Sequence, residues 1–218
     1  MTEAASISTT AAATAAPVRC WSCGGPVAAG ALFCGTCRVV QPPGELDHFA
    51  RLGLARDFAL DPADLDRRYF AAQRQLHPDR FATRSPRERA ISQSQAVALN
   101  DAYETLKAPL ARACYLLALS GVDRTPDRDH TIDDPALLME QMERREALAE
   151  AADADAARRI VADAEAEIAT VIDGLRPAFA RGDLVAARHA ATRLRYLEKL
   201  AEDARAAQQR LARRRETA

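Results

Sequence analysis

The sequence predicts an all-α protein, and three features indicate this class. The 218 residues are rich in alanine and contain only 5% aromatic side chains, which favours closely packed helices over the β-branched and aromatic strands of a sandwich or barrel. Beyond residue 45, every strong hydrophobic periodicity has helical spacing. Prolines and capping residues lie where these helices would begin, and glycines where they would end.

The N-terminal region carries a cysteine motif that is typical of a structural metal site. Its members are Cys20, Cys23, Cys34 and Cys37. They form two C-x-x-C pairs separated by ten residues, a spacing that can place four thiolates tetrahedrally around one ion. Four thiolates leave no open coordination position, so we expect a structural Zn²⁺ module over residues 19–40. A rubredoxin-like iron site and two disulfides are the alternatives.

Residues 1–18 are rich in Ala, Thr and Ser and are expected to form a disordered tail. They lack the features of a secretory signal and the arginines of a mitochondrial transit peptide. We therefore expect a bacterial cytoplasmic protein, or a mitochondrial matrix protein if the source is eukaryotic. No apolar run approaches the ~20 residues needed to cross a bilayer. The net charge of -1 argues against a protein whose main task is binding nucleic acid.

Residues 46–120 are predicted to contain four helices. A Pro- and Gly-containing linker at 41–45 precedes them. The first helix is short and ends at Gly53, two long helices pack antiparallel, and a closing helix begins at Pro109.

Capping signals locate the two long helices. Asp61 precedes Pro62 at the first helical position of one, and Ser85 with Glu88 forms a capping box at the start of the other. Pro78 ends the first long helix, because proline disfavours helical backbone at the residue before it.

A polar, turn-rich linker at 121–134 leads to residues 135–218, for which the periodicity predicts an antiparallel three-helix bundle. Gly182 and Asp183 are expected to end the second helix and cap the third. The last turns, from about residue 204, carry fewer large apolar residues and are expected to fray.

The loop at 77–85, which we call the HPD loop, begins with the tripeptide His77-Pro78-Asp79. The helix before it carries Arg67, Arg68 and Arg74 on its outer face. The helix after it ends with LNDAYETL (99–106). The tripeptide alone is a weak signal, but the helix order, the tripeptide and the N-x-A-Y-x-x-L pattern are all in register. This region resembles the J-domain, the module of DnaJ-type co-chaperones.

The resemblance implies that the HPD loop docks on a 70-kDa-class heat-shock chaperone of the HscA/DnaK type and stimulates its ATPase. The expected chaperone-binding residues are His77, Pro78, Asp79, Arg67, Arg68, Arg74 and Arg80. Pro78 would reduce the entropy lost on binding, Asp79 could bind a partner arginine, and the arginines could steer association. An ordinary solvated arginine face is the alternative. Because no nucleophile with a partner base is evident, we expect no enzymatic activity of the chain itself.

Over about residues 46–211, the chain resembles HscB, the dedicated J-protein of iron–sulfur cluster assembly. The resemblance rests on HPDRF, PLARACYLL, DPALLMEQMERREAL and RLRYLEKL (193–200), and the cysteine module resembles that of longer, metal-binding members. It implies binding of an IscU-type scaffold. The expected scaffold-binding residues are Leu138, Met139, Met142, Glu143, Glu146, Glu150 and Tyr196.

The residues themselves support an interaction surface on the helix after 135, since an apolar cluster that continues into an acidic stripe is not needed for a three-helix core. The alternative is that Leu138 and Met142 belong to a wide core face. Arg144 departs from the family pattern, which has an aliphatic residue there.

These observations predict a co-chaperone that delivers an IscU-type scaffold to an HscA-type chaperone. Two alternatives remain. One is a J-domain protein serving another client. The other is a zinc-ribbon nucleic-acid-binding protein, for which Arg19, Trp21, Phe33 and Arg38 are the only basic and aromatic residues available around the cysteines.

Overall fold

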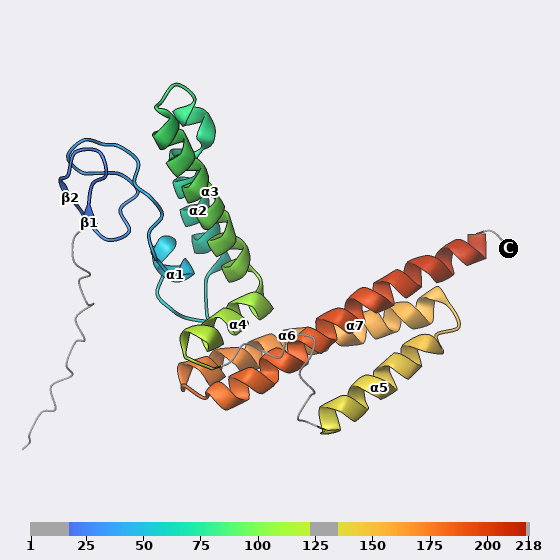
Figure 1. The fold of residues 1–218 in the computed structure, drawn as a ribbon. Helices are drawn as coiled ribbons and strands as arrows, with labels where there is room; N and C mark the ends of the chain where they lie inside the picture. Colours follow the sequence, from blue (N-terminus) through green and yellow to red (C-terminus); the bar gives the residue numbers. More distant parts are fainter. Residues whose placement is uncertain (1–17, 123–134, 217–218) are drawn as a thin grey trace, which may run out of the picture.

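The computed structural model describes residues 18–122 and 135–216, and it is mostly helical, as predicted (Figure 1). The expected disordered tail lies outside the described residues except for Val18, and so does the expected linker except for residues 121 and 122. None of the described helices has an apolar stretch long enough to span a bilayer.

The cysteine module contains a small sheet that the all-α prediction did not include. Strand β1 (Val18–Arg19) pairs antiparallel with β2 (Pro26–Val27), and Val18 lies opposite Val27. Val18 therefore belongs to the module and not to a disordered tail. A single bridge between Phe33 and Val40 closes the second half of the module.

The predicted four-helix region is present. Its helices are α1 (His48–Arg51), α2 (Pro62–Leu76), α3 (Pro86–Lys107) and α4 (Pro109–Leu119). The Asp61 side chain accepts from the Ala63 N–H at 3.0 Å. At the start of α3, Ser85 and Glu88 form the predicted reciprocal capping box. These local signals satisfy backbone groups that the first turn of a helix leaves without partners.

Helices α2 and α3 pack as an antiparallel hairpin held by two stacked tyrosines. The rings of Tyr69 and Tyr103 lie 3.9 Å apart between centroids. The Tyr69 hydroxyl donates to Asn100 Oδ1 at 3.0 Å, and the Tyr103 hydroxyl donates to Asp66 Oδ1 at 2.8 Å. The Asn and Tyr of the N-x-A-Y-x-x-L pattern thus make contacts that join the two helices.

The predicted three-helix bundle consists of α5 (Pro135–Ala149), α6 (Ala154–Ala180) and α7 (Leu184–Glu216). The turn between α6 and α7 forms as expected: Gly182 has a φ of 68°, and Asp183 Oδ1 accepts from the Ala186 N–H at 3.0 Å. The predicted fraying from about residue 204 is wrong as far as Glu216, because α7 continues and small residues such as Ala204 and Ala207 are buried.

The hairpin region and the bundle share one hydrophobic core. Helix α4 lies across α7 (Figure 1), and buried Leu117 and Leu194 belong to the same cluster. The rings of Phe58 and Phe179 stack at 5.3 Å. The shared core fixes the hairpin relative to the bundle and so separates the HPD loop from α5.

Candidate functional site

The HPD loop lies at the end of the α2–α3 hairpin that points away from the bundle (Figure 1). After α2 ends at Leu76, Pro78–Phe81 form a short 3₁₀ helix, η1. The side chains of His77 and Asp79 are 53% and 91% exposed. The Asp79 N–H donates to His77 Nδ1 at 3.3 Å, which caps η1. The tripeptide is therefore accessible from solvent while its backbone is locally ordered.

Buried residues on either side anchor the loop. Phe81 is 6% exposed and belongs to the main core. Ser92, which is fully buried on α3, donates from Oγ to the carbonyl of Leu76 at 2.7 Å. Leu76 immediately precedes His77, so these two contacts fix both ends of the exposed tripeptide.

The expected chaperone-binding arginines differ in exposure and in the bonds that they make within the protein. Arg67 is exposed and pairs with Asp64 within α2. Arg68 also pairs with Asp64, and its Nη1 donates to the Gly53 carbonyl at 2.6 Å, which fastens the end of α1 to α2. Sequence reasoning missed this anchoring role. Arg74 and Arg80 are exposed beside the loop, where an Arg80 nitrogen donates to the Arg74 carbonyl at 3.4 Å.

Helix α5 has an inner and an outer face. Leu137 and Gln141 are buried on the inner face. Leu148 packs against a small apolar cluster that Ala164 of α6 forms with Leu200 and Ala201 of α7. On the outer face, Leu138 is 42% exposed, and Met139 and Met142 are each 64% exposed. We call these three outward residues the α5 apolar patch. The alternative that Leu138 and Met142 belong to the core is therefore wrong.

The other predicted scaffold-binding residues lie as follows. Glu143, Glu146 and Glu150 are exposed along α5 and just beyond it. Tyr196 is half-buried on α7, one turn after Arg193. Arg193 donates to Glu140 of α5 at 2.8 Å, which places this part of α7 next to α5.

Arg144, the departure from the family pattern, belongs to an ion network that joins all three bundle helices. Its guanidinium contacts Glu140 of α5 and Glu167 of α6. Arg193 of α7 donates from Nε to Glu167 at 2.8 Å. Burial raises the pKa of Glu167, but hydrogen bonds from Arg144 and Arg193 outweigh it and hold the pKa below its usual value. Charge-assisted hydrogen bonds therefore hold Arg144 between α5 and α6.

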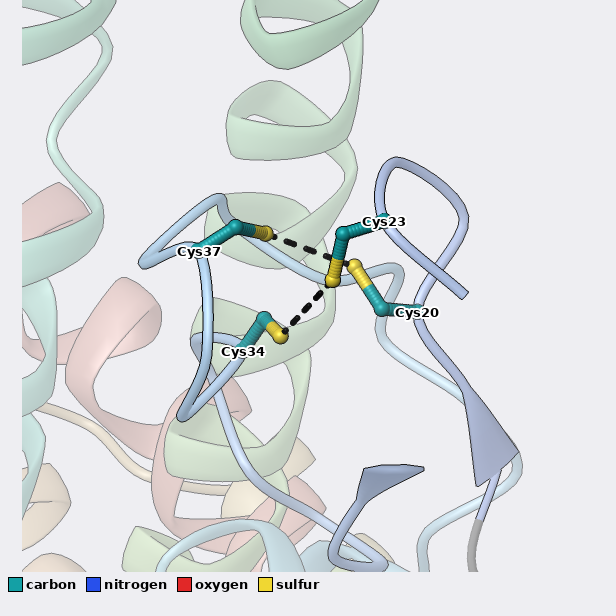
Figure 2. A group of neighbouring side chains, drawn as sticks. All are labelled: Cys20, Cys23, Cys34 and Cys37. Atoms are coloured by element: carbon teal, nitrogen blue, oxygen red, sulfur yellow. Dashed lines mark hydrogen bonds between the residues drawn. The ribbon is translucent and has the colours of Figure 1, made fainter. Parts of the chain in front are cut away.

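The four N-terminal cysteines converge, as Figure 2 shows. The Cys20 and Cys37 sulfurs lie 3.7 Å apart, as do those of Cys23 and Cys34. All four sulfurs lie within 4.8 Å of one another, and none forms a disulfide. A tetrahedral site with zinc–sulfur bonds of ~2.3 Å requires sulfurs ~3.8 Å apart. The residues present therefore fit a single four-thiolate ion.

The electrostatics of the cluster also favour a cation. Burial raises the pKa of Cys20, but N–H groups of Cys23 and Ser22 lower it to about 6. The pKa of Cys34 is lowered chiefly by the Cys37 backbone. At Cys37 the Val39 N–H lowers the pKa, yet burial and the neighbouring sulfurs raise it to about 12. These sulfurs cannot all ionise together easily unless a cation offsets their charge.

The cysteine module is docked on α3, which sequence reasoning missed. Gln41, placed in a linker by its Pro- and Gly-rich surroundings, is 5% exposed, and its backbone carbonyl accepts from Gln95 Nε2 of α3 at 2.8 Å. The Arg87 guanidinium lies 4.3 Å from the centre of the Trp21 ring. No local signal could have paired these residues, which are more than fifty positions apart in the chain.

Comparison with known proteins gives a consistent result. The model of the HSCB C-terminal oligomerisation domain matches residues 133–205. The chain is 38% identical over 188 residues to the iron–sulfur cluster co-chaperone protein HscB of Homo sapiens, covering 84% of this chain and 80% of that protein. It is 40% identical over 166 residues to the HscB homologue of Bordetella petrii, covering 74% of this chain and 95% of that one. The crystal structure of human HscB aligns with a TM-score of 0.81 at 38% identity, over 86% of this chain and 97% of that chain.

Proposed function

Because the chain belongs to the HscB family, the co-chaperones of iron–sulfur cluster assembly, we propose that it binds two partners at two separate surfaces. The HPD loop binds a 70-kDa-class heat-shock chaperone of the HscA type. The outer face of α5 binds an IscU-type cluster scaffold. The protein delivers the scaffold to the chaperone and stimulates the chaperone's ATPase.

The observation that carries the first half of the proposal is that an exposed tripeptide is anchored by buried residues on both sides. His77 and Asp79 are open to a partner, whereas Phe81 and Ser92 hold the backbone beneath them. A preformed loop loses little entropy on binding. Hydrolysis takes place on the chaperone, and the chain has no turnover of its own.

The second half rests on the α5 apolar patch and the carboxylates beside it. Methionine side chains adapt to a partner surface, and a contiguous exposed apolar cluster marks an interface. Glu143, Glu146 and Glu150 form a negative rim next to this cluster, which suits a partner with basic residues at its edge. Because both surfaces belong to one chain, bound scaffold is held at high effective concentration near the chaperone.

An ATPase assay tests the first half. The His77→Gln variant should lose stimulation of the chaperone, because the tripeptide contacts the partner. The His189→Gln variant is the matched control, since His189 is exposed on α7, and it should stimulate normally. Both variants should keep wild-type helicity and scaffold affinity. Full stimulation by a folded His77→Gln protein would contradict the proposal.

Scaffold titration tests the second half. Replacing Leu138, Met142 and Tyr196 together by alanine should weaken scaffold binding by at least tenfold, because hot-spot residues each contribute about 1 kcal/mol or more. ATPase stimulation in the absence of scaffold should be unchanged. The control is Val185→Ala, since Val185 is 73% exposed at the start of α7. Equal scaffold affinities for the triple variant and wild type would rule out this surface. A pull-down with a broad set of unfolded chains would favour a general J-protein.

We further propose that Cys20, Cys23, Cys34 and Cys37 hold one structural Zn²⁺ ion. The support is the convergence of the four sulfurs within 4.8 Å of one another and the closed, four-thiolate donor set. A bound zinc ion would supply folding energy to a module too small to form much core. A reducing compartment, the bacterial cytosol or the mitochondrial matrix, would keep the thiols available. Elemental analysis of purified protein should give one zinc per chain, and one iron per chain instead would favour the rubredoxin-like alternative.

A further inference from the structure

The cysteine module and the J-domain hairpin are joined by a buried chain of hydrogen bonds. Gln41 Nε2 donates to Cys20 Sγ at 3.3 Å and to the Val39 carbonyl at 3.0 Å. The backbone carbonyl of Gln41 accepts from Gln95 Nε2 of α3 at 2.8 Å. Gln41 is 5% exposed and Gln95 is 3% exposed. One buried residue thus contacts both a candidate metal ligand and the hairpin.

The same helix face reaches the HPD loop. Ser92 lies one turn before Gln95 on α3 and donates to the Leu76 carbonyl at 2.7 Å. Leu76 is the last residue of α2 and directly precedes His77. Hydrogen bonds therefore connect a cysteine sulfur through Gln41 to Gln95, and Ser92, one turn away on the same buried face of α3, holds the base of the HPD loop.

We infer that metal binding at the four cysteines is thermodynamically coupled to the packing of α3 and the base of the HPD loop, with Gln41 and Gln95 as the positioning residues. The inference rests on the proposed metal site. It assigns the metal module a role in holding the chaperone-binding loop, and it assigns two residues outside the cysteine motif a role in metal affinity.

The physical basis is the hydrogen bond to a ligand atom. A thiolate bound to a metal accepts an N–H···S bond, and such outer contacts typically change metal affinity by about 10- to 100-fold. The Gln41 backbone is held on both sides: its N–H donates to the Leu32 carbonyl at 2.9 Å, and its carbonyl accepts from Gln95 at 2.8 Å, so Gln95 helps to position Gln41 for this bond. Coupling between two sites is reciprocal. If the Gln95 contact strengthens metal binding, metal binding therefore stabilises the Gln95 contact, and with it α3, by the same free energy.

Metal titration of the full chain tests the first direction of the coupling. Co²⁺ is the probe, because its thiolate absorption bands report coordination directly. Gln41→Met removes the N–H···S bond and should weaken Co²⁺ binding by about 10-fold or more, with a shift of the thiolate band. Gln95→Met keeps every metal-module residue and should also weaken binding, by about threefold or more. The matched control is Gln93→Met, since Gln93 is exposed on the same helix, and it should bind as wild type.

Hydrogen exchange tests the reciprocal direction. Removal of the metal from wild type by a chelator should speed amide exchange at Ser92–Asn100 and at Leu76–Phe81, and should do so less in Gln95→Met. If Gln95→Met fails to fold, the same comparison between wild type and Gln41→Met decides the question.

The outcomes separate the two proposals. If wild type takes up no Co²⁺, Zn²⁺ or iron, the metal site and this inference both fail. If wild type binds metal, but Gln41→Met, Gln95→Met and Gln93→Met bind it equally, the inference alone is overturned. Exchange at the loop base that is insensitive to metal removal in wild type would also overturn it.

Discussion

The HPD loop and the α5 apolar patch are both exposed, but the protein supports them in different ways. Beneath the loop, Phe81 is packed in the main core and Ser92 holds the preceding backbone. Beneath the patch, α5 has few buried apolar residues and is tied down by charged groups centred on Glu167. Apolar contacts carry no titratable group, whereas an ion network depends on ionisation. We therefore expect a loop of fixed geometry and a helix whose attachment responds to pH and salt.

The largest effect is expected from removing the support of the loop. Phe81→Ala should lower the free energy of unfolding by about 3–5 kcal/mol, because it deletes a buried aromatic side chain and leaves a cavity. Thermal unfolding followed by circular dichroism measures this. Phe70→Ala is the control, since Phe70 is 48% exposed on α2, and it should cost less than about 1 kcal/mol. Similar costs for the two variants would mean that the loop is not anchored by packing.

A smaller effect is expected from removing the central charge beneath α5. Glu167→Gln should destabilise the protein by about 1–2 kcal/mol, since it weakens charge-assisted hydrogen bonds from Arg144 and Arg193 that are partly open to solvent. Amide exchange should rise mainly in α5. If amide exchange increased equally in α2 and α3, the network would not be stabilising the attachment of α5 specifically.

The ion network around Glu167 also predicts the direction in which the stability of the protein changes with pH. The folded pKa of Glu167 is depressed, so its contribution is fully present above the unfolded value of about 4.3 and is lost as the pH falls through the lower folded value. Stability measured from pH 6 downward should therefore fall more steeply in wild type than in Glu167→Gln. Parallel curves for the two proteins would contradict this assignment.

The smallest effect separates two neighbouring arginines of the hairpin. Arg68→Ala should cost about 1 kcal/mol, because Arg68 bonds the Gly53 carbonyl as well as Asp64. Arg67→Ala should change stability by less than about 0.5 kcal/mol, since Arg67 is itself exposed and its one partner, Asp64, lies in the same helix. If Arg67 serves docking, its variant should weaken chaperone binding at unchanged melting temperature, which differential scanning calorimetry and a binding titration would measure together.

The elements predicted well from sequence are those whose causes are local. Asp61, Ser85 and Asp183 cap helices through side chains that act within three residues, so their role follows from short-range sequence alone. The cysteine spacing likewise brings four sulfurs together within a segment of eighteen residues. The solvent exposure of Met139 and Met142 follows from helical periodicity once Leu137 is assigned to the core.

The features that sequence reasoning missed depend on partners far along the chain. Gln41 looked like linker because prolines follow it, yet it is buried against α3. Arg144 departs from the family pattern, and the residue that explains it, Glu167, lies on another helix and is shared with Arg193 of α7. Helix α7 keeps its order beyond residue 204 because alanines there are buried in the structure, which side-chain size alone does not indicate.

By itself, the sequence determined the helices, their caps, the convergence of the four cysteines and the proline-stiffened turn of the HPD loop, because each arises from interactions over a few residues. Only the tertiary structure decided that the cysteine module is docked on the hairpin, that hairpin and bundle share a core, and that Arg68 and Arg144 serve as anchors. These contacts join segments brought together by the collapse of the whole chain, and burial and charge pairing of that kind have no local signature.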